Sequence, residues 1–145
     1  MFKHILVPVD GSSTANQALE KAASIAQAFK SAVTVVCVID LYAFVGLGGE
    51  VAYGQAEYLD AATAEAHLAI NNARLFFDTS GLAVTTTVLE GQVIYKSILE
   101  AADSAQADLI VMGSHGRKGL EKLVLGSVAA QILSHTHLPV MIVRD

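Results

Sequence analysis

Cysteine, positive charge and long apolar runs are all scarce in this sequence, and each scarcity excludes a class of protein. The single cysteine, Cys37, cannot form an internal disulfide, and its place in an apolar strand-like run favours a buried structural thiol. Nine lysines and arginines against fourteen aspartates and glutamates give a net charge of −5. This balance argues against a general nucleic-acid or membrane-surface binder, because both need a basic face.

No apolar run approaches the ~20 residues of a membrane span. Met1–His4 leads directly into a strand pattern and lacks the shape of a signal peptide. We therefore expect a cytoplasmic protein with a reduced thiol, no nucleic-acid partner and no membrane insertion.

Apolar residues are abundant instead. They make up 53% of the chain, while charged residues make up only 16%, and this composition excludes a disordered chain. A length of 145 residues fits one domain with one sizeable core. We expect residues 1–145 to form that domain.

Short apolar runs alternate with segments of helical spacing along the chain. The runs are as short and continuous as strands covered on both faces, and the segments between them carry apolar stripes typical of amphipathic helices. The expected strands are residues 5–9, 32–39, 83–89, 109–112 and 139–143, and the expected helices lie within 15–29, 59–77, 94–102 and 128–134. The glycine-rich segment 41–55 predicts a loop. Asp10-Gly11-Ser12-Ser13 predicts a turn and a helix cap before the first helix. Thr14, with Gln17 three residues later, also matches a capping box at the start of that helix.

This alternation predicts the α/β class, with a doubly wound, five-stranded parallel sheet and helices on both faces. Right-handed crossovers leave few topologies, and the strand order 3-2-1-4-5 places a switch point between the first and fourth strands. Ligands of such sheets bind at the carboxyl ends of the strands beside the switch point. Those ends are Val9-Asp10-Gly11 and Met112-Gly113, so we expect the two segments to meet at one crevice.

A spaced glycine motif follows the fourth expected strand. It consists of Met112-Gly113-Ser114-His115-Gly116, nine further residues, and then Gly126-Ser127 at the start of the last helix. Glycine lets the backbone approach a ligand closely, and a helix N-terminus attracts phosphate through its unpaired N–H groups. The motif therefore predicts the two ends of one nucleotide site.

The residue types of this region suit an anionic ligand. Backbone N–H groups of residues 126–129 and the Ser127 hydroxyl can donate to phosphate oxygens, and Asp10 can accept from a ribose hydroxyl. His115 is the histidine best placed for ligand contact, although the sequence names no partner to orient it as a base. The intervening loop supplies cations that can screen phosphate charge: Arg117, Lys118 and Lys122. The alternatives are that the glycines only permit a tight turn, that Ser127 and Asp10 only cap helices or turns, and that the cations are solvated.

Three segments of the chain together resemble a known family. Ile5-Leu6-Val7-Pro8-Val9-Asp10-Gly11-Ser12 is similar to the opening of universal stress proteins, and Leu138-Pro139-Val140 is similar to their last strand. The glycine motif matches that family's pattern of Gly-x-x-Gly, nine residues and Gly-Ser or Gly-Thr. The resemblance spans the whole chain. It implies a Rossmann-like fold of the adenine nucleotide α-hydrolase type and the binding of ATP or a related adenine nucleotide.

The resemblance also implies a role for each residue of the site. Adenine and ribose are expected beside Pro8, Val9 and Asp10, with Val38 closing over the base and Met112 and Gly113 flanking the ribose. The phosphates are expected in a cradle of Gly116, Gly126, Ser127 and Val128. Ala129 stands where the family often has Ser or Thr, so one hydroxyl contact to phosphate is missing. This departure weakens the expected grip on a γ-phosphate and leaves AMP and ADP open beside ATP. Separately from the resemblance, the Asp10 carboxylate could hold Mg²⁺ through water if the nucleotide carries this ion.

Three functions remain open from the sequence. The first is a regulatory stress-response module that binds an adenine nucleotide and is not an enzyme. The second is a slow ATPase or nucleotidyl-transfer enzyme, but no Gly-Lys-Ser or Gly-Lys-Thr follows the glycine loop to supply the lysine of a P-loop. The third is a partner-binding domain that does not use nucleotide, and Ala129 is the residue that favours it.

Two further features concern metals and partners. His135 and His137 form a His-x-His pair where the last helix ends, and a helix-end role is favoured there over a metal site. The last strand, Val140–Val143, lies at a sheet edge in the expected order and is apolar and uncharged. An unprotected edge of this kind favours pairing, so we expect a two-fold homodimer through these strands, which the family resemblance also implies.

Overall fold

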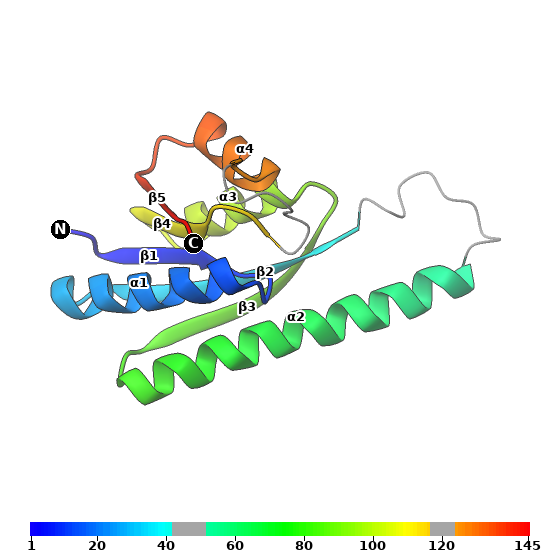
Figure 1. The fold of residues 1–145 in the computed structure, drawn as a ribbon, viewed down its shortest axis with the longest axis horizontal. Helices are drawn as coiled ribbons and strands as arrows, with labels where there is room; N and C mark the ends of the chain where they lie inside the picture. The colour runs from blue at the N-terminus through cyan, green and yellow to red at the C-terminus, as the bar shows by residue number, and fades with distance from the viewer. Residues whose placement is uncertain (42–51, 117–123) are drawn as a thin grey trace.

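The computed structural model describes residues 1–41, 52–116 and 124–145, with only the backbone at Ala52 and Tyr53. Strands and helices alternate along the chain, as the sequence predicts (Figure 1). The strands are β1 (His4–Pro8), β2 (Ala32–Asp40), β3 (Val84–Gly91), β4 (Leu109–Gly113) and β5 (Val140–Val143), and the helices are α1 (Ser13–Phe29), α2 (Ala52–Ser80), α3 (Ile94–Ser104) and α4 (Ser127–His135).

The five strands form one sheet in the order β3-β2-β1-β4-β5, with parallel pairing throughout. The predicted α/β class and the strand order 3-2-1-4-5 are therefore confirmed. The direction in which successive strands are added to the sheet reverses between β1 and β4, where Ile5 pairs in parallel with Leu109. This is the switch point at which the ligands of doubly wound sheets bind.

Side chains alternate between the two faces of each strand, and the sheet therefore separates two apolar clusters. Ile5 and Val7 of β1 pack with α1 and α2, whereas Leu6 packs on the opposite face with α3 and α4. Figure 1 shows α1 and α2 on one side of the sheet and α3 and α4 on the other. The helices thus fix the sheet from both sides and leave the carboxyl ends of the strands to the loops.

The start of α1 differs from the sequence prediction. Ser12, not Thr14, is the N-cap residue, and its hydroxyl accepts a hydrogen bond of 3.3 Å from the backbone N–H of Ala15. The predicted capping box of Thr14 and Gln17 is therefore wrong. Thr14 lies within the helix and is fully buried, so its hydroxyl is available for a tertiary contact instead of a local cap.

Helix α2 begins earlier than the sequence predicts. It starts at Ala52, inside the segment 41–55 that we expected to be a loop, so that expectation is wrong for residues 52–55. Residues 42–51 lie outside the described part of the chain. Gly54 obscured the helical pattern because glycine weakens a helix and adds no apolar side chain to its stripe. The other end is as predicted: Gly81 follows the helix with a φ of 71°. Among the described residues, no helix combines the length and apolarity that a membrane span requires.

Candidate functional site

The carboxyl ends of β1 and β4 bring the Asp10 turn and the glycine loop together. Pro8 is the last residue of β1, as expected for a residue without an N–H near a strand end. The chain continues with Val9, whose N–H donates to the carbonyl oxygen of Val36 at 2.8 Å. A Cβ atom built on Gly116 would lie 2.5 Å from Oδ2 of Asp10. The two segments therefore meet at one place, as the topology predicted, and a side chain at position 116 would occupy the space of the carboxylate.

Asp10 stabilises the turn that precedes α1. Its Oδ1 accepts a hydrogen bond of 2.9 Å from the backbone N–H of Ser12, and Gly11 between them has a φ of 82°. This arrangement is an Asx turn, in which the carboxylate substitutes for a backbone acceptor. The turn fixes the carboxylate at the end of β1, with Oδ2 facing Gly116. Stabilising the turn and facing the glycine loop are thus compatible roles of one side chain.

The first half of the glycine loop lies against α1. A Cβ atom on Gly113 would lie 2.7 Å from Oγ1 and 2.9 Å from Cβ of Thr14, so any larger residue would collide with the helix. The Thr14 hydroxyl donates a hydrogen bond of 2.6 Å to the carbonyl oxygen of His115. Sequence reasoning did not assign Thr14 to this region. The available signal was its position on the helix that follows the Asp10 turn.

Ser114 joins the loop to two other elements. Its backbone N–H donates to the carbonyl oxygen of Val143 at 2.8 Å, and its own carbonyl oxygen accepts from the N–H of Gly126 at 2.7 Å. Its side chain is buried, and its hydroxyl lies 3.1 Å from Nδ1 of His115. The loop is therefore held by α1, by the end of β5 and by the residue that begins α4.

The second half of the motif places the start of α4 on the same loop. Gly126 is the N-cap residue, with a φ of −62° and a ψ of 155°, and glycine offers no side chain to accept from the first-turn N–H groups. A Cβ atom at this position would lie 3.0 Å from both the Cα of His115 and the carbonyl oxygen of Ser114. The glycine therefore permits the close approach that brings a helix N-terminus next to residues 114–116.

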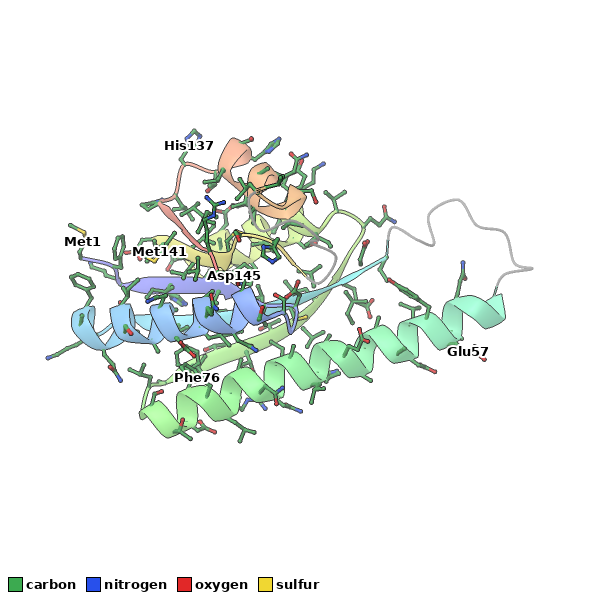
Figure 2. The ribbon with its side chains drawn as sticks, in the orientation of Figure 1. Met1, Glu57, Phe76, His137, Met141 and Asp145 are labelled. Carbon is green, nitrogen blue, oxygen red and sulfur yellow. The ribbon has the colours of Figure 1, made fainter. Side chains whose placement is uncertain are left out.

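His115 has two polar neighbours that the sequence did not reveal. Besides the Ser114 hydroxyl at Nδ1, its Nε2 lies 3.9 Å from Oδ2 of Asp145, with the two side chains 14% and 27% exposed. Asp145 lies at the end of the chain, beyond β5, and is labelled in Figure 2. An ion pair at this distance and exposure contributes at most about 1 kcal/mol. The contact places the end of β5 beside the glycine loop.

The remaining expected site residues differ in how deeply they are buried. Val9 and Met112 are buried in the clusters on opposite faces of the sheet, and Val38 packs against the α3–α4 cluster two residues beyond Val36. At the start of α4, Ser127 is exposed and Val128 is partly buried. Arg117, together with Lys118 and Lys122, lies outside the described residues.

Ala129 projects into the protein interior. Its side chain is buried in the cluster that α3 and α4 form with the sheet. A methyl group fills this position, and it cannot donate to a ligand. The backbone N–H groups of the first turn of α4 and the Ser127 hydroxyl are therefore the donors that this helix end offers.

The His-x-His pair at the end of α4 takes part in a helix-end contact. Nδ1 of His135 lies 2.8 Å from the carbonyl oxygen of Gln131, and its ring centroid lies 4.8 Å from that of Tyr95. His137 is exposed in the following loop (Figure 2). Within residues 1–41, 52–116 and 124–145, no group of three His, Cys, Asp or Glu side chains is arranged to hold a metal ion.

An open groove of about 510 Å³ lies elsewhere, between α3 and strands β1 to β3. At one end His4 meets the buried Thr34, with Nε2 and Oγ1 2.7 Å apart. The groove does not include Asp10 or the glycine loop. We place the candidate site at the switch point, because ligands of doubly wound sheets bind there and because Gly113, Gly116 and Gly126 each lie against another element at that place.

Comparison with known proteins identifies the family of this chain. The chain matches the universal stress protein family over residues 1–144. A universal stress protein of Methanocaldococcus jannaschii is 36% identical over 145 residues, which cover 99% of this chain and 83% of that protein. Among solved structures, UspA from Lactobacillus plantarum is 28% identical with a TM-score of 0.86, covering 98% of this chain and 97% of that one. The universal stress protein from Archaeoglobus fulgidus, solved in complex with dAMP, is 24% identical with a TM-score of 0.72, covers 98% of each chain and shares the fold. The chain belongs to the universal stress protein family.

Proposed function

We propose that residues 1–145 act as one cytoplasmic domain that binds an adenine nucleotide at the β1–β4 crevice and serves as a regulatory stress-response module. The observation that carries this proposal is the joining of Ser114 to Gly126, which sets the glycine loop beside the N-terminus of α4. A loop of small residues next to unpaired helix N–H groups provides donors for a phosphate.

The proposed contacts divide the site into two parts. Adenine and ribose lie at the ends of β1, β2 and β4, where Asp10 can accept from a ribose hydroxyl; the other contacts there are Pro8, Val9, Val38, Met112 and Gly113. Phosphate oxygens accept from the backbone of Gly116 and residues 126–129 and from the Ser127 hydroxyl, and His115 and Arg117 are proposed as further contacts. The dAMP complex of the Archaeoglobus fulgidus protein supports the choice of an adenine nucleotide as the first probe.

The burial of Ala129 bears on the number of phosphates bound. The N-terminus of α4 offers its backbone N–H groups and the Ser127 hydroxyl as donors, which are enough to bind one phosphate. With Ala at position 129 we expect a terminal phosphate to be held less firmly than with Ser or Thr there. We propose that AMP and ADP bind at least as tightly as ATP. Any Mg²⁺ with ATP would be held through water by Asp10, whose carboxylate also stabilises the turn before α1.

A regulatory role is favoured over catalysis by the chemistry of the loop. A phosphoryl-transfer site needs a positioned lysine or arginine and a metal carboxylate, and the sequence lacks the Gly-Lys-Ser or Gly-Lys-Thr of a P-loop. The slow ATPase therefore remains the second candidate. The test that separates the two is turnover of ATP in the presence of Mg²⁺.

We also propose that two copies pair through β5. This strand lies at the edge of the sheet, bonded to β4 on one side, and its Met141 is 39% exposed. An apolar edge strand of this kind is a template for pairing with another chain. A two-fold dimer would place the proposed nucleotide sites close to the shared strands, because Val143 accepts a hydrogen bond from Ser114 of the glycine loop.

Thermal unfolding with and without nucleotide tests the proposed function. Millimolar AMP, ADP and ATP should each raise Tm, because a ligand at about 100 times its Kd stabilises the folded state by about 2.7 kcal/mol. Guanosine monophosphate is the control for base selectivity, and inorganic phosphate is the control for the anion alone. Unchanged Tm with all three adenine nucleotides would overturn nucleotide binding. Repeated turnover of ATP with Mg²⁺ would replace the regulatory role with the enzymatic one.

A further inference from the structure

We infer that Thr14 is a positioning residue for the phosphate of the ligand: it sets the orientation of the peptide unit between His115 and Gly116. This inference deepens the proposed function and rests on it. Thr14 does not itself reach the crevice, since its side chain is fully buried in the first turn of α1. It acts through the glycine loop.

The contact itself is short, and its donor side chain is fully buried. The Thr14 hydroxyl donates to the carbonyl oxygen of His115 at 2.6 Å, at the short end of the range for a hydroxyl donor. The Ser12 hydroxyl lies 3.4 Å from the same oxygen of Thr14 and caps α1. Threonine is stiff about its first side-chain torsion, because two heavy atoms branch from Cβ. The acceptor position of the His115 carbonyl is therefore fixed by the helix.

A fixed carbonyl also fixes the next N–H. The peptide unit is planar and trans, so the N–H of Gly116 points away from the side to which the His115 carbonyl points. That carbonyl points at the buried Thr14, and Gly116 is exposed. The Gly116 N–H is thus held toward the open side of the loop, where the proposed phosphate accepts it. Rotation of this peptide changes ψ of His115 and φ of Gly116, and glycine leaves that φ unrestrained, so the peptide can rotate when the Thr14 hydroxyl is absent.

A second contact limits the motion of the loop on the same side. Gly113 packs against Thr14 so closely that a Cβ atom on Gly113 would lie 2.7 Å from Oγ1 of Thr14. Thr14 therefore contacts the loop on both sides of Ser114, by packing at Gly113 and by a hydrogen bond at His115. Packing alone would survive replacement of the hydroxyl by a methyl group, whereas the orientation of the 115–116 peptide would not. This difference separates a positioning role from a purely structural one.

The experiment compares Thr14→Val, which has nearly the same shape without the hydroxyl, with Thr14→Ser, which keeps the hydroxyl. AMP affinity is measured by calorimetry on each folded variant, and adenosine is the phosphate-free probe. We expect Thr14→Val to weaken AMP binding about tenfold and to leave adenosine binding within about twofold, since one oriented donor to a charged group is lost. Thr14→Ser should stay within about threefold of the wild type for AMP. Thr14→Ala is the second variant, because it cannot collide with Gly113 if valine does.

A second readout observes the peptide directly. In NMR spectra of the wild type and Thr14→Ser, AMP should shift the backbone amide resonance of Gly116, and in Thr14→Val that shift should be lost. Wild-type AMP affinity in both Thr14→Val and Thr14→Ala would overturn the positioning role. So would an equal loss of AMP and adenosine affinity, since the whole pocket would then have changed. Failure of the wild type to bind AMP would overturn the proposed function itself, and this outcome is recognised without any variant.

Discussion

The backbone N–H of Gly126 donates to the carbonyl oxygen of Ser114 at 2.7 Å, and this bond closes the loop that separates the two halves of the glycine motif. The three glycines of the motif then have separate structural reasons. Gly113 and Gly116 allow contact with Thr14 and Asp10, while Gly126 allows α4 to begin against the loop backbone. Each glycine stands where a different element approaches too closely for a side chain.

Gly126→Ala should disrupt both the fold of the loop and ligand binding. The new Cβ would lie 3.0 Å from two backbone atoms, the Ser114 oxygen and the His115 Cα, which cannot move aside as a side-chain end can. We expect a loss of about 1–3 kcal/mol in the free energy of unfolding, typical of overpacking. Urea denaturation measures this loss, and calorimetry with AMP measures the accompanying fall in affinity.

Gly54→Ala is the matched control for that variant. Gly54 lies inside α2, and a Cβ atom there would meet nothing within 4 Å. Alanine is the better helix former by about 0.5–1 kcal/mol, so this variant should be slightly more stable and bind AMP as the wild type does. Unchanged AMP affinity in Gly126→Ala would contradict a phosphate site at the start of α4.

Gly116→Ala should act through Asp10. Its Cβ would lie 2.5 Å from Oδ2 of Asp10, so the carboxylate must rotate away from the crevice while the backbone stays in place. We expect a small change in stability and about a tenfold loss of AMP affinity, because a hydrogen bond to a charged acceptor contributes about 1.5–3 kcal/mol.

A double-mutant cycle with Asp10→Ala checks that mechanism. If the glycine matters because it leaves room for the carboxylate, Gly116→Ala should have little further effect on AMP affinity once the carboxylate is gone. Additive losses in the cycle would instead mean that Gly116 and Asp10 contribute independently. Asp10→Asn is the control that removes the charge of this side chain but keeps the turn, because its amide oxygen can still accept a hydrogen bond from the backbone N–H of Ser12.

The sequence predicted the strands of the sheet well, because the apolar patterns that mark strands and helices lie within short stretches of the chain. Continuous apolar runs such as Leu109–Met112, separated by helical stripes, were sufficient to locate the strands. Right-handed crossovers then left few strand orders, and the order 3-2-1-4-5 brought Asp10 and the glycine loop together. The early start of α2 was missed because Gly54 weakens the local helical pattern. In these cases the prediction followed residue spacing, and it failed only where spacing was interrupted.

The contacts that refine the site could not be predicted in this way. Thr14 seemed suited to a local cap, yet Ser12 takes that role and frees Thr14 for His115. The approach of Asp145 to His115 depends on where β5 ends relative to β4. Such contacts join residues that are far apart in the chain and produce no repeating pattern in the sequence. They can therefore be found only from the tertiary structure.

Asp108 should make the stability of the protein depend on pH in the acid range. Burial raises the pKa of this carboxyl, but hydrogen bonds from the backbone N–H groups of Lys3 and His4 outweigh burial and hold its pKa below the usual value. A lowered pKa contributes stability that is present above the unfolded-state pKa of about 3.9 and is lost as the pH falls through the folded-state value. Asp108→Asn should therefore destabilise the protein at neutral pH and approach the wild type in acid.

Urea denaturation from about pH 7 down to about pH 3 measures the difference between the two curves. Asp103→Asn, an exposed position on α3, is the control for removing one negative charge. Parallel curves for wild type and Asp108→Asn across the whole range would show that the bonds to Lys3 and His4 do not favour the ionised form. Neither substitution is near the glycine loop, so AMP affinity at neutral pH should be unchanged in both.

Met141→Lys should convert the proposed dimer into a monomer. Met141 is 39% exposed on β5, so a lysine there can be solvated within one chain but places a charge on the strand edge that pairing would bury. Light scattering should give twice the chain mass of 15.2 kDa for the wild type and 15.2 kDa for the variant. Leu68→Lys is the matched control, because Leu68 is 60% exposed on α2 and should leave the dimer intact. A monomeric wild type, or a dimeric Met141→Lys, would contradict pairing through β5. Since Val143 of the same strand accepts from Ser114, the monomeric variant should also bind AMP more weakly if pairing steadies the glycine loop.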